Sequence, residues 1–311
     1  MIEFEHISYN DPVFDEVIDQ VKKTVSNYDS SLLIKYLNEE HKTRKDYSGR
    51  EIYELLQNAE DQESEYVKIF LDESVIRIEN GGSECVPFSR KGFISIMMAD
   101  KSPKLDNGNK QFIGSKGLGF RSILNWAKSI KISSNEVTCE FSRDIADGFW
   151  DEIKKSISLN ASNKDYDSES VIKAHESFAN SQYGFDTPVP TLLKPKTSQY
   201  SGQPSSTIIE IEYDKNNEYV LEGIKEQLQT IDGNILLFLK NIKTVEIENR
   251  LDNVVEKYER QSIKAINDNI SEYEISRTHG SEPPITNIFY VYKEEGMLDK
   301  RKYEVGIAYC K

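Results

Sequence analysis

The chain has few of the residues that cross-link proteins or bind transition metals. Its 311 residues include three cysteines and four histidines. Cys85, Cys139 and Cys310 lie far apart, without the spacing of a metal site, and the isolated histidines supply no ligand cluster. The sequence therefore predicts a reduced, cytoplasmic protein.

Long apolar runs and an excess of basic residues are also missing. Nowhere do about eighteen apolar residues run together, and the N-terminus has no basic segment followed by an apolar core. We therefore expect neither a membrane span nor secretion. The formal net charge of −14 opposes non-specific binding to a polyanion. Local basic loops leave a contact with nucleic acid open.

What is present is typical of a globular protein with a sizeable core. Hydrophobic residues make up 37% and charged residues 30%, and 17 Tyr with 13 Phe argue against general disorder. This length has room for one large domain, or for one domain of roughly 200 to 250 residues and part of another.

A polar face on a predicted helix is the first feature with chemical content. From Arg50 onward the apolar residues follow helical spacing. Within this helix Glu54, Asn58 and Asp61 stand at i, i+4 and i+7, so a carboxylate, a carboxamide and a second carboxylate share one face.

A pair of strands is predicted next, at 66–71 and 75–79, from apolar residues at every second position. The pair ends at Asn80-Gly81-Gly82. Because side chains alternate across a strand, Asn80 lies on the same face as Ile78. If the isoleucine faces the core, Asn80 faces the same interior.

A glycine-rich segment follows a predicted helix at 88–98. A polar loop containing Lys101 and Ser102 leads into it, and long loops in compact domains are often functional lids or disordered. The segment reads Ile113-Gly114-Ser115-Lys116-Gly117-Leu118-Gly119-Phe120. A helix is predicted from Phe120 to Ala127, and its free N-terminus suits an anion.

The remaining elements are predicted by the same periodicities. They are two lead-in helices within 11–40, strands at 130–134 and 137–141, an insertion at about 154–205 with a short helix at 170–179, a strand at 206–213 that includes Thr207, a helix at 219–232, a helical apolar run at 236–242, and strands at 244–248, 288–292 and 303–309. We expect one domain at 1–250 and the beginning of a second, truncated domain at 251–311.

Four motifs follow one another along the chain: the polar helix face, the strand end at Asn80, the loop with its glycine segment, and the strand with Thr207. Their types and order resemble those of GHKL ATPases, the Bergerat-fold superfamily of gyrase, the ninety-kilodalton heat-shock chaperones, histidine kinases and MutL. Glu-Leu-Leu-Gln-Asn-Ala-Glu-Asp and Ile-Gly-Ser-Lys-Gly-Leu-Gly-Phe are most similar to the sacsin and NO VEIN type of ATP-binding domain, with MORC proteins next. The resemblance covers about residues 10–250. It implies an α/β (α+β) two-layer sandwich, with helices over one face of a mixed, mostly antiparallel sheet.

The resemblance also assigns roles to the polar helix face. Asn58 would bind Mg²⁺ through its side-chain oxygen, and Glu54 would be the general base that orients the attacking water. Asp61 would assist on the adenine or ribose side. The alternative is a solvated helix face, with Asn58 bonding a neighbouring backbone group.

The other motifs would bind the nucleotide. Backbone N–H groups of the glycine segment would close on the β- and γ-phosphates, where Lys116 either reaches a phosphate or stays solvated. Phe120 would anchor the start of its helix in the core. Lys101 and Ser102 lie where the lid of the family begins, and Thr207 either bonds near adenine or is an ordinary strand threonine. The predicted cofactor-binding residues are Asn58, Asp61, Asn80, Gly82, Lys101, Ser102, Gly114, Ser115, Lys116, Gly117, Leu118, Gly119, Phe120 and Thr207.

One departure from the family concerns adenine recognition. The second motif usually opens with Asp, whose carboxylate accepts the adenine amino hydrogen, and this chain has Glu79-Asn80 instead. The alternation of side chains along the strand favours Asn80 over Glu79 as the residue that contacts adenine. The side-chain carbonyl of Asn80 can accept the same hydrogen bond but carries no charge. A flipped amide would present a donor.

The function implied by the resemblance is Mg²⁺-dependent hydrolysis of ATP to ADP. It would drive lid closure and a conformational or self-association switch, with further domains or partner proteins beyond Lys311. The first alternative is a nucleotide-gated scaffold with little or no hydrolysis. The second is a histidine-kinase catalytic domain, which is disfavoured because no helical phospho-acceptor domain precedes the motifs.

Overall fold

The computed structural model describes residues 4–19, 46–97, 119–160, 194–298 and 301–311. The elements in chain order are α3 (Glu51–Asp61), β1 (Tyr66–Leu71), β2 (Val75–Gly81), α4 (Arg90–Met97), η2 (Gly119–Asn125), β3 (Ala127–Ser134), β4 (Val137–Ser142), α5 (Arg143–Asn160), β5 (Lys196–Gln199), β6 (Ser206–Tyr213), α7 (Glu218–Thr230), η3 (Gly233–Leu237), β7 (Thr244–Asn249), β8 (Val254–Ala265), β9 (Ile270–His279), β10 (Ile285–Leu298) and β11 (Arg301–Cys310).

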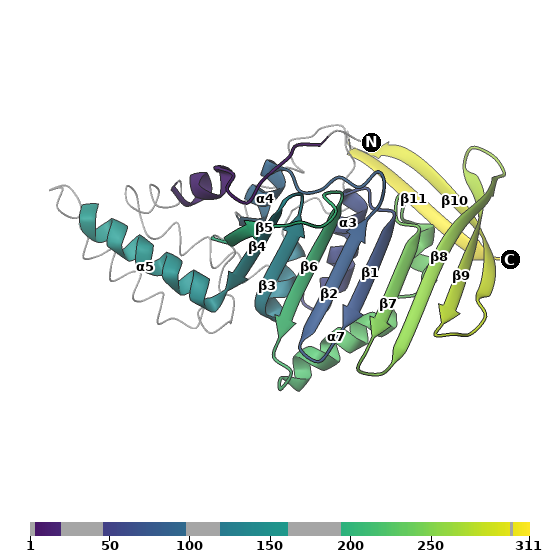
Figure 1. The fold of residues 1–311 in the computed structure, drawn as a ribbon. Helices are drawn as coiled ribbons and strands as arrows, with labels where there is room; N and C mark the ends of the chain where they lie inside the picture. The colour runs from purple at the N-terminus through teal and green to yellow at the C-terminus, as the bar shows by residue number, and fades with distance from the viewer. Residues whose placement is uncertain (1–3, 20–45, 98–118, 161–193, 299–300) are drawn as a thin grey trace.

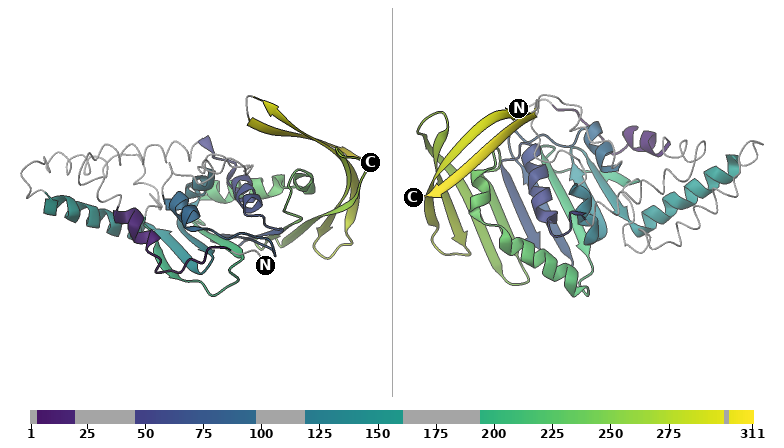
Figure 2. Two further views of the ribbon diagram at one scale, coloured as in Figure 1. Left: turned by 90° about the horizontal axis from the view of Figure 1, so that it is seen from above. Right: turned by 180° about the vertical axis from the view of Figure 1, so that it is seen from behind.

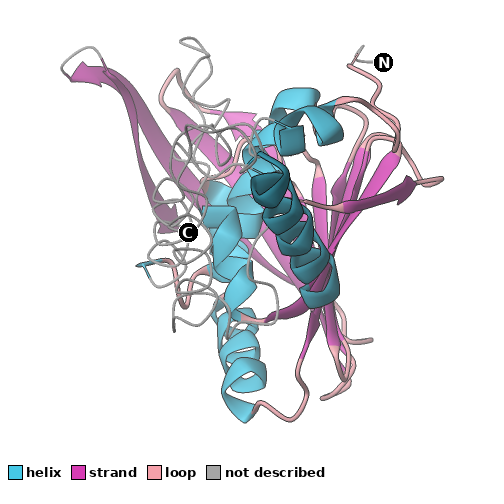
Figure 3. Ribbon diagram, turned by 90° about the vertical axis from the view of Figure 1, so that its left-hand side faces the viewer, coloured by secondary structure: helices cyan, strands magenta, loops and turns pink. Residues whose placement is uncertain are grey.

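One mixed, mostly antiparallel sheet of eleven strands organises the protein (Figure 1). Its order is β11-β10-β9-β8-β7-β1-β2-β6-β3-β4-β5, and the parallel pair is β1 with β7. Helices α3, α4 and α7 lie on one face of the sheet (Figures 2 and 3), while α5 extends away beyond β4. The predicted α+β class with a mixed, mostly antiparallel sheet is therefore confirmed.

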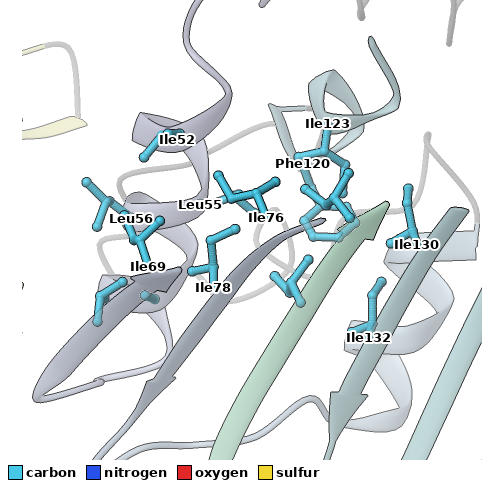
Figure 4. Packing of buried hydrophobic residues seen from close by; sticks show 14 of the residues in the cluster. Ile52, Leu55, Leu56, Ile69, Ile76, Ile78, Phe120, Ile123, Ile130 and Ile132 are labelled. Carbon is cyan, nitrogen blue, oxygen red and sulfur yellow. The ribbon is translucent and has the colours of Figure 1, made fainter. Parts of the chain in front are cut away.

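The core lies between α3 and the central strands. Ile52, Leu55 and Leu56 of α3 are buried, as are Ile76 and Ile78 of β2, and these side chains face one another (Figure 4). Apolar residues three and four positions apart form one helix face, and every second strand residue points toward it. Burial of this continuous apolar surface seats α3 on the sheet.

Two segments predicted as α-helices form 3₁₀ turns instead. The prediction for 120–127 is wrong, because η2 ends at Asn125 and β3 begins at Ala127. The prediction for 236–242 is also wrong, because η3 ends at Leu237. Both are short connectors into strands, where 3₁₀ geometry is common. Each segment buries apolar side chains at closely spaced positions, and this spacing is also typical of an α-helix, which is why the sequence predicts a helix there.

The chain after η3 is held by two opposite charges. The Glu60 carboxylate accepts hydrogen bonds from the N–H groups of residues 240–242, at 2.8–3.2 Å. The Arg260 guanidinium donates to the carbonyl oxygens of Leu236 and Leu239, and to that of Lys240 at 3.0 Å. Side chains thus replace the hydrogen bonds that a continued helix would have made.

Beyond residue 250 the structure has four strands where the sequence predicts two. The missed strands are β8 and β9, which carry polar side chains on both faces and bury few apolar residues, such as Tyr258 and Ile275. Ladder hydrogen bonds rather than apolar alternation hold these strands. Because β8 pairs with β7, the strands after 250 extend the same sheet. The predicted domain division at this point stays a prediction.

The predictions for the lead-in region and the insertion are covered only in part. Residues 13–19 are helical, with Val13 and Val17 buried as their spacing predicts. Of the predicted insertion, α5 runs to Asn160 and β5 forms a short edge strand. The helix predicted at 170–179 lies outside the described residues.

Candidate functional site

The polar residues of α3 differ in how far they are withdrawn from solvent. Glu54 is only 7% exposed, and its Oε1 lies 3.8 Å from Nη2 of Arg50, one turn earlier. Asn58 and Asp61 are half-buried. A solvated helix face therefore does not describe Glu54. A buried carboxylate is costly to keep without a purpose in packing or chemistry.

A second carboxylate of α3 fixes the start of the helix. Glu51 accepts hydrogen bonds from Gln227 Nε2 at 2.6 Å, Gly49 N at 2.9 Å and Asn125 Nδ2 at 3.1 Å. These bonds tie α3 to α7 and to the end of η2. Gly119 and Phe120, the last two residues of the glycine segment, belong to η2, and η2 packs against α3.

Asn80 and Thr207, which are 127 positions apart in the sequence, stand directly opposite each other in the sheet. They are register partners in the antiparallel pair of β2 and β6. Asn80 is 2% exposed and Thr207 is fully buried. The prediction from strand parity that Asn80 points to the interior is confirmed. Glu79, the other candidate for adenine contact, bonds Arg77 and Tyr66 on the opposite face.

A polar network connects this pair to the end of α3. Asn80 Nδ2 donates to Gln62 Oε1 at 3.0 Å and to Ser64 Oγ at 2.7 Å. Gln62, the residue that caps α3, donates through Nε2 to Thr207 Oγ1 at 3.1 Å. Ser134 Oγ lies 2.8 Å from Thr207 Oγ1. Polar groups this deep need such partners, and the network holds each of them in a defined orientation.

The orientation of the Asn80 amide has a chemical consequence. Both hydrogens of its Nδ2 are engaged by Gln62 and Ser64. Its Oδ1 accepts no hydrogen bond from the residues that the structure describes. Among the described residues, the Asn80 oxygen is therefore the atom of this amide that can still accept a hydrogen bond.

A buried thiol closes the network at its other end. Cys85 Sγ lies 3.4 Å from Ser64 Oγ, and burial raises the pKa of the Cys85 thiol above its usual value. The thiol therefore stays protonated at neutral pH and is a poor nucleophile.

Gly82 follows β2 at a position that excludes a side chain. Its φ is +147°, and a Cβ there would lie 2.6 Å from Glu65 Cγ. Glycine adopts such a backbone conformation without strain. This structural demand accounts for Gly82 independently of any nucleotide.

Replacing Gly82 by Ala should lower the free energy of unfolding by about 1–3 kcal/mol, because both the backbone and the contact with Glu65 become strained. Urea denaturation followed by circular dichroism measures it. Gly223→Ala in α7 is the matched control, since its Cβ meets no atom within 4 Å and alanine favours a helix. Equal stabilities of the two variants would contradict this interpretation.

The glycine segment itself is seen only at its end. Lys101, Ser102, Gly114, Ser115, Lys116, Gly117 and Leu118 lie outside the described residues. Gly119 begins η2, and Phe120 is buried in the core cluster as predicted. Arg121 is almost completely buried and donates through Nη2 to the carbonyl of Ile96 in α4, at 2.7 Å.

Gln62, Ser64, Ser134 and Arg121 are the residues that sequence reasoning missed. The first three are short or neutral polar residues at the ends of elements, where caps and turns place the same types. Only the structure, which brings Gln62, Ser64 and Ser134 within hydrogen-bonding distance of Asn80 and Thr207, shows that they form a network. Arg121 adjoins the glycine segment, and that position was the one available signal.

A separate groove of about 540 Å³ opens between the start of α3, the end of η2 and α7. Its lining includes Glu51, Trp126 and Tyr219, but not Asn58, Asn80 or Thr207. The Glu51 carboxylate in this groove is already occupied by the three donors described above. The groove is therefore distinct from the predicted nucleotide site.

Comparisons with known proteins add no family assignment. No protein-family model matches the chain, and no curated protein is significantly similar to it. Within the described ranges, no group of three or more His, Cys, Asp or Glu side chains could hold a metal ion. No helix in that part of the chain is long and apolar enough to cross a membrane.

Proposed function

We propose that the chain is a GHKL-type ATPase of the Bergerat fold that binds ATP with Mg²⁺ and hydrolyses it to ADP. The single observation that carries the proposal is the buried pairing of Asn80 with Thr207, joined through Gln62 to the end of α3. Asn80 and Thr207 belong to two separate sequence motifs, and Gln62 directly follows the polar helix face that ends at Asp61. The end of the glycine segment, in η2, packs against the same helix.

In this proposal Asn80 selects the base. Its Oδ1 would accept a hydrogen from the exocyclic amino group of adenine, whereas guanine presents a carbonyl oxygen at the corresponding position. Gln62 and Ser64 hold the amide so that the oxygen is available. Thr207 and Asp61 would bond near the base and ribose.

The residues of α3 would act at the phosphates. Asn58 would bind Mg²⁺ through its carbonyl oxygen, since this ion prefers hard oxygen ligands and shares them with phosphates. The bound ion would neutralise charge on the β- and γ-phosphates. Glu54, one turn earlier and largely withdrawn from solvent, would accept a proton from the attacking water. By resemblance, turnover would drive a conformational or self-association switch in a larger protein.

A scaffold that binds nucleotide without appreciable turnover is the second candidate. It is favoured by the proximity of Arg50, because the Glu54 carboxylate then faces a guanidinium group as well as any attacking water. The neutral Asn80 is also a weaker acceptor than the usual carboxylate. Titration calorimetry with ATP and ADP, with and without Mg²⁺, together with a phosphate-release assay, separates the two. Binding without phosphate release supports the scaffold, and no binding of either nucleotide contradicts both.

Replacing Asn80 by Ala should weaken ATP binding roughly 10- to 100-fold, because a buried acceptor is lost. Calorimetry with ATP and GTP measures the change, and GTP affinity should alter far less. Ser64→Ala removes one partner of the network but keeps the Asn80 oxygen, so it should lower stability more than affinity. Exposed Asn216→Ala is the matched control. Unchanged ATP affinity in a folded Asn80→Ala protein would contradict the assignment.

A further inference from the structure

The two edges of the sheet are protected very differently. The edge strand β5 has four residues, Lys196 to Gln199, all of them polar. The opposite edge, β11, has ten residues, and its segment from Val305 to Cys310 carries no charge. Natural proteins usually shorten or charge an edge strand to prevent association. The centre of β11 lacks both safeguards.

The outer face of β11 carries an exposed apolar stripe. Val305, Ile307 and Tyr309 are 49%, 46% and 66% exposed. The inner face is occupied, because Gly306 lies under the ring of Phe238 and Ala308 packs against the core. Only the face with Val305, Ile307 and Tyr309 is therefore open to a partner.

The backbone of β11 has a defined outward set of hydrogen-bonding groups. Lys311 N donates to Ile288 O on the β10 side at 2.8 Å, and the ladder has no bulge. Backbone direction alternates along an antiparallel strand, so the odd-numbered residues turn their N–H and C=O groups toward β10. The even-numbered residues turn theirs outward, namely Glu304, Gly306, Ala308 and Cys310.

We propose that β11 pairs with β11 of a second copy of this chain, antiparallel and centred on Ile307. In that register Val305 faces Tyr309, Gly306 faces Ala308, Glu304 faces Cys310, and Ile307 faces its own copy. The outward groups of the even-numbered residues then meet one another. The two apolar stripes join across a two-fold axis, which makes the interface self-complementary.

Competing registers are less favourable for two physical reasons. A shift of the partner by one residue places the exposed face of one copy beside the inner face of the other, against the alternation of the pleat. A shift that centres the pair on Gly306 sets two glycines face to face at the two-fold axis, where neither contributes a side-chain contact. The register centred on Ile307 has no like-charge pair. It uses no residue of α3, β2 or β6, so it is independent of nucleotide binding.

Sedimentation velocity over a concentration series tests the proposal on the full chain. The unaltered protein should show a monomer–dimer equilibrium. Ile307→Lys should abolish the dimer, because it places two lysines face to face at the two-fold axis. Ile285→Lys is the matched control, since Ile285 is 64% exposed and lies on β10 before the pairing with β11 begins at Phe289. A monomer at every concentration, or a dimer unaffected by Ile307→Lys, overturns the proposal.

Two further variants test the register and the backbone contacts. Ile307→Cys combined with Cys310→Ser should give a covalent dimer on oxidation, whereas Ile285→Cys in the same background should not. Ala308→Pro removes an outward N–H without removing a bond to β10, so the dimer should be lost while the circular dichroism spectrum is kept. Equal cross-linking of both cysteine variants, or an intact dimer in Ala308→Pro, would also overturn it.

Discussion

Replacing Glu54 by Gln should lower the rate of phosphate release from ATP by roughly 100- to 10,000-fold, the usual contribution of a general base. Glutamine keeps the size of the side chain but cannot take a proton from water. Because Glu54 would contact the water rather than the base or the Mg²⁺ ion, ATP affinity should stay within a few-fold of the original. Single-turnover phosphate release measures the first quantity, and calorimetry measures the second.

The control for Glu54 is another glutamate in a first helical turn. Glu218 in α7 is exposed, so Glu218→Gln should leave both quantities unchanged. Arg50→Ala adds a further test, because it removes the guanidinium group that lies 3.8 Å from the Glu54 carboxylate. If Glu54→Gln releases phosphate at the original rate, Glu54 is not the base. If neither protein hydrolyses ATP but both bind it, the scaffold alternative holds.

Replacing Glu60 by Ala should lower the free energy of unfolding by about 3 kcal/mol or more, the largest stability loss that we expect from one polar residue. Glu60 is buried, and its carboxylate accepts from the backbone N–H groups of three successive residues, 240–242. The Asn241 Nδ2 group also donates to it, at 3.1 Å. Its removal leaves these donors without their acceptor, and they are buried at Ile242 and partly buried at the other positions. Urea denaturation with a global fit of the slope measures the loss.

Two variants separate this capping role from a simple loss of charge. Glu60→Gln keeps one acceptor oxygen, so it should cost less than Glu60→Ala. Glu259→Ala removes a partly exposed carboxylate that is ion-paired with Lys257 at 3.0 Å, and should change stability by less than about 1 kcal/mol. If Glu60→Ala is as mild as Glu259→Ala, the segment 240–242 does not depend on Glu60.

Local periodicity was sufficient wherever one face of an element is buried against the core. The helix at 51–61 and the strands of β1, β2 and β6 were predicted nearly to the residue for that reason. The same alternation placed Asn80 inside, because burial of Ile78 commits every second residue to the interior. Periodicity failed where side chains from elsewhere complete the hydrogen bonds, as at η3, and where strands bury little, as in β8 and β9.

Some residues of the candidate site were predictable from local sequence, and others were found only in the structure. The residue types and their order already indicated Glu54, Asn58, Asn80 and Thr207, because their chemistry is local to each motif. Sequence could not assign roles to Glu51 and Glu60, the other two glutamates of α3, since these roles depend on the distant residues that each carboxylate meets.

The sequence by itself determined the strands of the central sheet and the interior position of Asn80, since both follow from the alternation of apolar residues in a short stretch. The class of the fold was implied by the resemblance of the motifs and their order. Only the tertiary structure decided that Asn80 meets Thr207, that Gln62 holds both, and that Glu51 and Glu60 fasten α3 to distant segments. These contacts join residues up to about 180 positions apart. Their partners are set by the pairing of strands and the seating of α3, which no local pattern encodes.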